Sequence, residues 1–322
     1  MSNRRTQLRV AYAPGFTRQS GFGAPLSPSA LTAVLTTREG GQSHIDPVFK
    51  TEDLNDCTTQ YLMDYIVLHR YATLTLDLEV DAQVLGDLYG MALGTVSGSV
   101  ATMLGPTEYV LPATTLIVGF ADGDDPGIVL SDAVVKSIEI SGRVEQKLQV
   151  KVVFCGRGDM LDAAGFVFPD CETITPLRFD NNTLFQVNSL EYKDDTRAFS
   201  LSFDNNVPLS DFPFSLGSVD ISRALERGDK RPLTLNWTVT GRENDSLGDA
   251  AITVPPTHYD FMIRIGSGLN GVVLEAADAI LRPQSNLQGF DGEVSLAVLN
   301  LMLTPTRIPG DSSTPLQVTT TV

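Results

Sequence analysis

The chain has 322 residues, 42% of them hydrophobic, which is enough for one large domain or two of ordinary size. Its 39 acidic and 23 basic side chains give a formal net charge of −16, which argues against tight binding to a nucleic-acid backbone. The three cysteines and three histidines follow no metal-ligand spacing, so we expect no metal site and no cofactor.

The first 35 residues are rich in proline, glycine and serine, which makes a helix there unfavourable. We expect residues 1–35 to be a flexible N-terminal arm. Two interpretations stay open, a disordered tail and an arm that becomes ordered against a neighbouring subunit.

Residues 36–156 are predicted to form a first β-rich module. Its clearest strand is 71–80, where leucine and valine alternate with threonine and acidic residues, Asp77 and Glu79 among them. Asp81 is placed to cap a helix over 82–93, which Gly94 would end. Further strands are expected at 115–121, 128–140 and 147–154.

A long connection over 94–112 separates this helix from the next strand, and we interpret it as a projecting hairpin. If the protein assembles into stacked rings, four residues of this connection are the candidates for the contact between rings: Glu108, Tyr109, Val110 and Leu111. Because the connection and the termini have no apolar pattern of their own, we expect them to be mobile in a free subunit and ordered in an assembly.

Residues 157–182 show no periodicity and are predicted to be a linker, after which 183–305 repeat the order of the first module. The strand at 232–240 resembles 71–80, with Thr234 and Asn236 on its polar face and Trp237 on its apolar face. A short helix near 246–251 follows, and then strands at 260–265, 272–280 and 294–300. We interpret this order as an internal duplication, with about 15 extra residues in the 94–112 connection of the first copy. Residues 306–322 form a C-terminal tail.

The chain contains no sequence pattern that indicates catalysis. A P-loop, a Gly-x-Ser-x-Gly turn and a Gly-x-Gly-x-x-Gly loop before a helix are all absent. The acidic turn at 122–127 resembles a calcium loop, but Pro126 breaks the required ligand spacing. We therefore predict that the protein is not an enzyme. The N-terminus lacks the apolar run of a signal peptide, and no segment reaches the length of a membrane span, so we expect a soluble protein made in a cytoplasm.

The succession of strand 74–80, helix 84–94 and the strands at 130–140 and 147–154 resembles the tail tube proteins of long-tailed bacteriophages. The second copy, over 231–303, is similar. The resemblance implies a mainly β fold of two tandem modules, each made of packed antiparallel sheets (a sandwich or partial barrel) with one flanking α-helix. It also implies a structural virion protein that self-assembles into stacked rings, in which the inner sheets close into a tube that conducts DNA during ejection.

Within that family six modules form one ring. A chain with two modules would then need three copies for a ring with pseudo-sixfold symmetry, and six copies remain the alternative if the second module lies outside. The candidate lumen-facing residues are Asp77, Glu79, Thr234 and Asn236, past which DNA would move without specific binding. The further partners implied are the tape measure, terminator and distal tail proteins, with no membrane, and the location is the virion after assembly in the bacterial cytoplasm.

The main rival is a β-sandwich tail-tip or capsid decoration protein that binds carbohydrate or a receptor. Such a protein should present an aromatic platform, whereas the single tryptophan lies on an apolar strand face. A glycosidase built on a β-scaffold ranks third. Lys147 and Lys151 place positive charge on the polar face of their strand, which leaves two options if the protein forms a tube. Either that face does not line the lumen, or neighbours such as Glu139 balance the charge.

Overall fold

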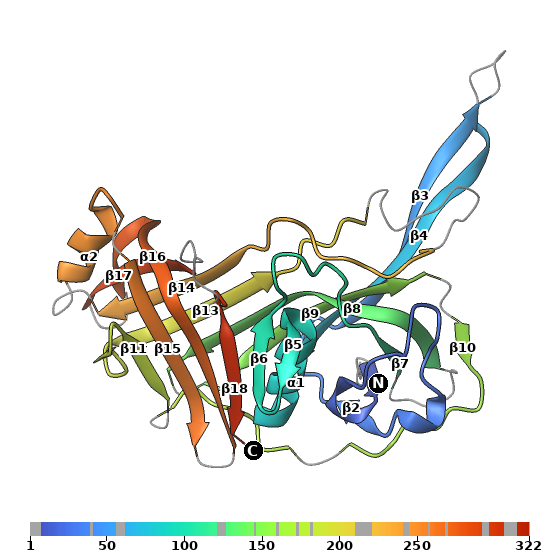
Figure 1. Ribbon diagram of the computed structural model, residues 1–322, viewed down its shortest axis with the longest axis horizontal. Coiled ribbons are helices and arrows are strands. Elements are labelled where there is room, and N and C mark those ends of the chain that lie inside the picture. The colour runs from blue at the N-terminus through green and yellow to red at the C-terminus, as the bar shows by residue number, and fades with distance from the viewer. Residues whose placement is uncertain are drawn as a thin grey trace, which may run out of the picture.

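The computed structural model is mainly β, which confirms the predicted fold class (Figure 1). The part of the chain that it describes comprises residues 8–38, 41–55, 62–120, 127–144, 146–158, 161–171, 174–180, 183–209, 221–240, 245–256, 258–267, 270–291, 296–305 and 314–321. In these ranges the chain forms 18 strands, two α-helices and two short 3-10 helices, η1 (Pro14–Phe16) and η2 (Pro28–Ala30). All strand pairs between them are antiparallel.

The first half of the chain forms ten strands and one helix. They are β1 (Leu8–Tyr12), β2 (Ala33–Leu35), β3 (His44–Asn55), β4 (Leu62–Leu78), α1 (Ala82–Leu93), β5 (Gly94–Ser97), β6 (Val100–Met103), β7 (Thr114–Phe120), β8 (Gly127–Arg143), β9 (Gln149–Arg157) and β10 (Leu161–Ala163). Neighbouring strands pair in the order β1-β7-β8-β9-β4-β3, while β10 pairs with the beginning of β8.

The strands of the second half pair in an order that matches the first half. Its elements are β11 (Leu184–Val187), β12 (Leu190–Glu191), β13 (Thr196–Asp204), β14 (Leu233–Thr240), α2 (Asp245–Ile252), β15 (His258–Ser267), β16 (Asn270–Asp291), β17 (Leu296–Pro305) and β18 (Gln317–Thr321). The pairing order is β11-β15-β16-β17-β14-β13, and β18 pairs with the beginning of β16. Each strand of this series therefore has a counterpart at the same place in the first half.

The main joint between the two halves is the pairing of β8 with β13, and β18 also pairs with β6. The second half of β8, Ser137–Arg143, pairs with β13 over Ala198–Asp204. Because β8 also pairs with β9 and β13 also pairs with β14, the sheet continues from one half into the other. Figure 1 shows this run of strands across the middle of the molecule, with the β3–β4 hairpin extending away at one end.

Helix α1 has the boundaries that the sequence predicts. The Asp81 carboxylate accepts a hydrogen bond from the Val84 N–H at 2.9 Å, and Gly94 ends the helix in a left-handed conformation with φ of 100°. One face of the helix, which includes Leu85, Leu88 and Tyr89, is buried against the sheets. Burial of this apolar face stabilises a helix that contains two glycines.

The core of the second half is centred on Trp237 in β14. Its ring is fully buried and stacks on Phe185 at 4.9 Å between ring centroids, and its indole N–H donates to the Thr196 hydroxyl at 3.0 Å. A buried tryptophan needs such a partner for its polar N–H. The predicted alternation of β14 is therefore correct, with Leu233, Leu235, Trp237 and Val239 inward.

The structure differs from the sequence analysis at the chain ends. Residues 8–35, expected to be flexible, include β1, which pairs with β7 and contains the buried Val10, and η1, which contains the buried Phe16. In the tail, β18 pairs with both β16 and β6. Both segments complete sheets of the same chain, and local composition does not reveal such long-range pairing. Residues 1–7 and 306–313 lie outside the described residues.

The predicted strand at 128–140 is confirmed as β8, which extends to Arg143. One further boundary differs. The predicted linker 157–182 includes β10, and its residue Leu177 is buried, donating its N–H to the Val80 carbonyl and accepting from the Leu148 N–H. These contacts fix part of the linker to the first half.

Asn205 holds α1 next to the junction of the two halves. Its fully buried side-chain amide donates to the Ala92 carbonyl at 2.8 Å and to the Val135 carbonyl at 2.9 Å. Replacing it with alanine leaves two buried carbonyls without this donor, and we expect Asn205→Ala to lower the free energy of unfolding by about 1–3 kcal/mol. Urea unfolding measures this change. The exposed Leu190→Ala is the control, expected to stay within about 0.5 kcal/mol; an equal loss in both variants would contradict the role given to Asn205.

Candidate functional site

The continuous sheet has one apolar and one polar face, and the polar face is the candidate functional surface. Across the five neighbouring strands β4, β9, β8, β13 and β14, one row of directly opposed residues points into the core: Leu76, Val152, Ile138, Phe203 and Leu233. The next row points the other way: Asp77, Lys151, Glu139, Ser202 and Thr234. Because side chains alternate along every strand, the polar row lies on one surface that spans both halves.

The structure brings the four predicted lumen-facing residues onto this one surface. Asp77 and Glu79 lie between the buried Leu76, Leu78 and Val80. Thr234 and Asn236 alternate in the same way with buried residues of β14. Asn236 is opposite Ser200 of β13, which is in turn opposite Ser141 of β8. Residues about 160 positions apart in the sequence thus belong to one sheet face.

The positive charges on this face have acidic neighbours. The Lys147 ammonium lies 2.7 Å from a Glu79 carboxylate oxygen. Lys151 is directly opposite Asp77 on one side and Glu139 on the other, and the Ser200 hydroxyl donates to Glu139 at 2.8 Å. Of the two options that the sequence left for Lys147 and Lys151, these contacts favour charge balance by neighbours. The face is therefore a mixed polar surface with paired charges.

The candidate ring-stacking residues lie against the second half of their own chain. The Leu111 N–H donates to the Leu225 carbonyl at 3.0 Å, and the Leu111 side chain is buried. The guanidinium of the buried Arg227 donates to the Glu108 carbonyl at 2.7 Å and lies 4.6 Å from the centre of the Tyr109 ring. The prediction of a projecting hairpin at these residues is wrong, because 108–111 are held against the second half. The hairpin in this connection is β5–β6, which precedes them. Of the four residues, Glu108, Tyr109 and Val110 are exposed.

Sequence reasoning missed two features that matter for this surface. One is the buried Arg227, because nothing in the sequence around it distinguishes it from an arginine on the surface. The other is the hairpin of β3 and β4, which projects beyond the rest of the molecule (Figure 1). From the sequence, residues 53–70 stay open between a short helix and a strand, and the β-favouring run at 65–68 is the signal for a strand. In β3 the His44 imidazole lies 3.1 Å from an Asp46 carboxylate oxygen, and the two side chains extend the polar face to its edge.

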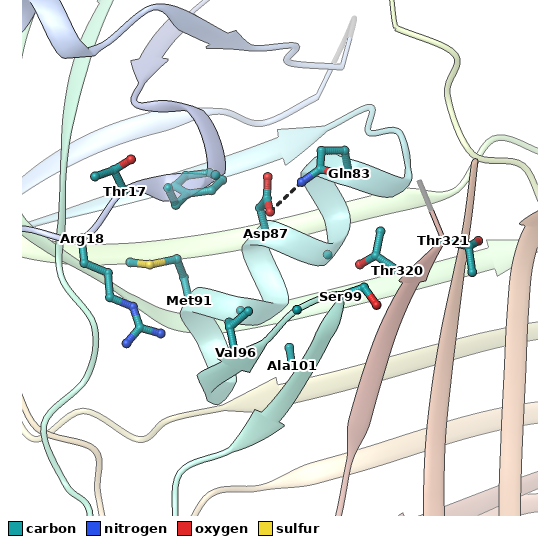
Figure 2. Close-up of a pocket in the computed structure, with 15 residues that line it drawn as sticks. Thr17, Arg18, Gln83, Asp87, Met91, Val96, Ser99, Ala101, Thr320 and Thr321 are labelled. Atoms are coloured by element: carbon teal, nitrogen blue, oxygen red, sulfur yellow. Dashed lines mark hydrogen bonds between the residues drawn. The ribbon is translucent and has the colours of Figure 1, made fainter. Parts of the chain in front are cut away.

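A separate cavity of about 640 Å³ lies between α1, η1 and β18 (Figure 2). Gln83 and Asp87 of α1 point toward it and share a hydrogen bond of 2.9 Å. Burial raises the pKa of Asp87, the hydrogen bond from Gln83 opposes this, and the nearby Asp81 adds to it. Asp87 is the one carboxylate among the described residues that line the cavity, and Arg18 lines it as well.

A comparison with protein-family models and a comparison with curated proteins each found no match. Among the described residues, no three histidine, cysteine, aspartate or glutamate side chains lie close enough to hold a metal ion together. Neither of the α-helices in those residues has the length and hydropathy needed to cross a membrane.

The ion pair between Glu79 and Lys147 should contribute little to stability, because 46% of the lysine and 20% of the glutamate side chain are exposed. A double-mutant cycle with Glu79→Gln and Lys147→Gln should give a coupling free energy of about 0.2–1 kcal/mol that decreases as salt screens the charges. Urea unfolding at low and high salt measures it. Glu79→Gln combined with a change at the exposed Lys230 is the control and should be additive. A coupling that high salt leaves unchanged would contradict this account.

Proposed function

We propose that the protein is a tail tube subunit with two tandem tube modules, and that three chains form each ring of a stacked tube through which DNA leaves a phage capsid. The observation that supports this best is the junction of β8 with β13. At this junction two halves with the same strand order join edge to edge and share one polar face. A ring of such modules requires a joint of this kind at every module boundary.

Two strand edges at the ends of the sheet, one in each half, correspond to the two sides of the internal junction. The counterpart of β13 is β3, which pairs with β4 on one side and, within the described residues, with no strand on the other. The counterpart of the second half of β8 is the second half of β16, where β17 is the only partner in those residues. The two edges lie at opposite ends of the molecule (Figure 1).

A second copy of the chain is the natural partner for these edges. Joining β16 of one chain to β3 of the next repeats the internal joint, and repetition with a constant rotation closes a ring. Closure also covers sheet edges that would otherwise aggregate. Since both modules are in the same sheet, the second module is suited to line the ring with the first. This favours three chains over six, the six modules per ring being the number that the family resemblance implies.

The shared polar face is the surface that we assign to the lumen. Lys147 forms an ion pair with Glu79, and Lys151 has Asp77 and Glu139 opposite it, so DNA phosphates would meet cations that have acidic neighbours. The rival receptor-binding function has less support, because Trp237 is buried and the exposed aromatic side chains among the described residues, Phe22 and Tyr109, lie in separate segments. Partnership with tape measure, terminator and distal tail proteins remains part of the proposal.

The proposed joint can be tested by cross-linking. In the internal junction Asp204 is opposite Ser137. When the strand registers of the two halves are aligned counterpart by counterpart, Val48 of β3 takes the position of Asp204. Arg282 of β16 takes the position of Ser137. We expect the double variant Val48→Cys/Arg282→Cys to form disulfide-linked dimers and trimers, with trimer as the largest product. Non-reducing gel electrophoresis and negative-stain microscopy of rings measure the outcome.

The background for this experiment is Cys57→Ser/Cys171→Ser, while Cys155 can remain because burial raises the pKa of its thiol to about 12. Val48→Cys combined with a cysteine at the exposed Arg264 of β15 is the matched control and should not cross-link. Discrete monomers without rings would contradict the tube function. A ladder that continues to six chains would contradict the trimeric ring.

The luminal assignment has its own test. Reversing two acids, in Asp77→Lys/Glu79→Lys, removes the partners of Lys147 and Lys151 and makes the face strongly basic. We expect rings and tubes still to form, but DNA to be retained during transit because its phosphates bind the new cations. DNA ejection from particles assembled with the variant measures this, and Arg264→Glu on β15 is the control for an unrelated charge change. Undiminished ejection would contradict a luminal position of this face.

A further inference from the structure

The C-terminal strand β18 makes a second contact between the two halves, separate from the β8–β13 joint. It pairs with β16 along one edge and with β6 along the other, so it connects the second half to the hairpin that follows α1. Thr320 packs directly on α1 at Gly86, where a Cβ atom would overlap the threonine hydroxyl. Figure 2 shows Thr320 beside this helix. The internal boundary is thus held by a strand joint and by a strand-on-helix contact.

Both partners of this second contact have counterparts elsewhere in the chain. β10 follows β9 and pairs with the beginning of β8, as β18 follows β17 and pairs with the beginning of β16. Matching the two registers places Ala164 at the position of Thr320. Helix α2 corresponds to α1, since Leu247-Gly248-Asp249 repeats Leu85-Gly86-Asp87 and both leucines are buried. Gly248 is therefore the counterpart of Gly86.

Within one chain these counterparts do not form the second contact. The pairing of β10 in the described residues is with β8 alone, and the main contacts of α2 are with β16 and β17 of its own half. Both surfaces also expose large apolar side chains. Leu161 and Val167, at β10, are 63% and 84% exposed, and Ile252 and Val254, at the end of α2, are 61% and 90% exposed. A groove lined in part by Ala163, Ala164 and Val167 runs beside β10.

We propose that α2 and residues 252–254 of one chain dock on β10 and residues 164–167 of the next chain, and so form the second contact of the inter-chain boundary. The inference rests on the proposed ring, because it repeats between chains what α1 and β18 do within one. It names a surface that the strand joint does not include. Docking would remove four exposed apolar side chains from water, which favours association.

Disulfide trapping tests the contact. The pair Gly248→Cys/Ala164→Cys, in the Cys57→Ser/Cys171→Ser background, should form inter-chain disulfides with trimer as the largest product. The pair Gly86→Cys/Thr320→Cys is the positive control for the geometry, because it should form the corresponding bond within one chain. If the β3–β16 cysteine pair cross-links and the Gly248–Ala164 pair does not, the inference is wrong while the ring proposal stands. If neither pair cross-links, both are wrong.

A second measurement does not depend on cysteine geometry. Ile252→Glu places a charge in the proposed contact, and we expect the fraction of chain in rings to fall roughly tenfold at equal concentration because burying an unpaired charge is unfavourable. Leu190→Glu, at a residue that is also 61% exposed but lies on β12, should leave that fraction unchanged. Mass photometry measures both, and circular dichroism verifies that each variant is folded. Equal ring fractions for the two variants would overturn the inference.

Discussion

The arrangement of this protein depends on the hydrogen-bonded pairing of β8 with β13. Without it the two halves would still meet through β18 and β6, but they would present two independent polar faces. With it, apolar residues stay on one face of the sheet and polar residues on the other from β4 to β14. Leu76 and Leu233 therefore belong to one core, and Asp77 and Thr234 to one surface. A shift of one residue at this pair would turn every side chain of one half to the opposite face.

The long strands β8 and β16 make such a joint possible because each pairs with different strands along its length. The beginning of β8 pairs with β7 and its later part with β9 and β13, with a register irregularity between Val135 and Ser137 where the partners change. β16 has the same division, with an irregularity between Pro283 and Gln288. Irregularities of this kind bend a strand, so one strand can belong to two packed layers. The fully buried Asn205 links this bend to the end of α1.

The sequence predicts what depends on neighbours in the chain and misses what depends on distant partners. Asp81, Gly94 and the alternation in β4, β9 and β14 act locally, and the structure confirms the helix and the strands that they predict. The ordering of residues 8–35 depends on β7, and that of the C-terminal strand depends on β6 and β16, which no local pattern encodes. The four candidate lumen residues share a face because alternation is a local property that the continuous sheet preserves. Leu111 was misplaced because its burial depends on Leu225.

The two open edges help to explain why a boundary between chains would need more than strand pairing. Each contains a proline, Pro47 in β3 and Pro283 in β16. A proline is tolerated where its nitrogen points away from the ladder, so it removes a donor from the open edge and hinders pairing with unrelated strands. The same missing donor weakens a correct joint. A second contact through side chains, as β18 makes with α1 inside the chain, restores specificity without adding an exposed strand edge.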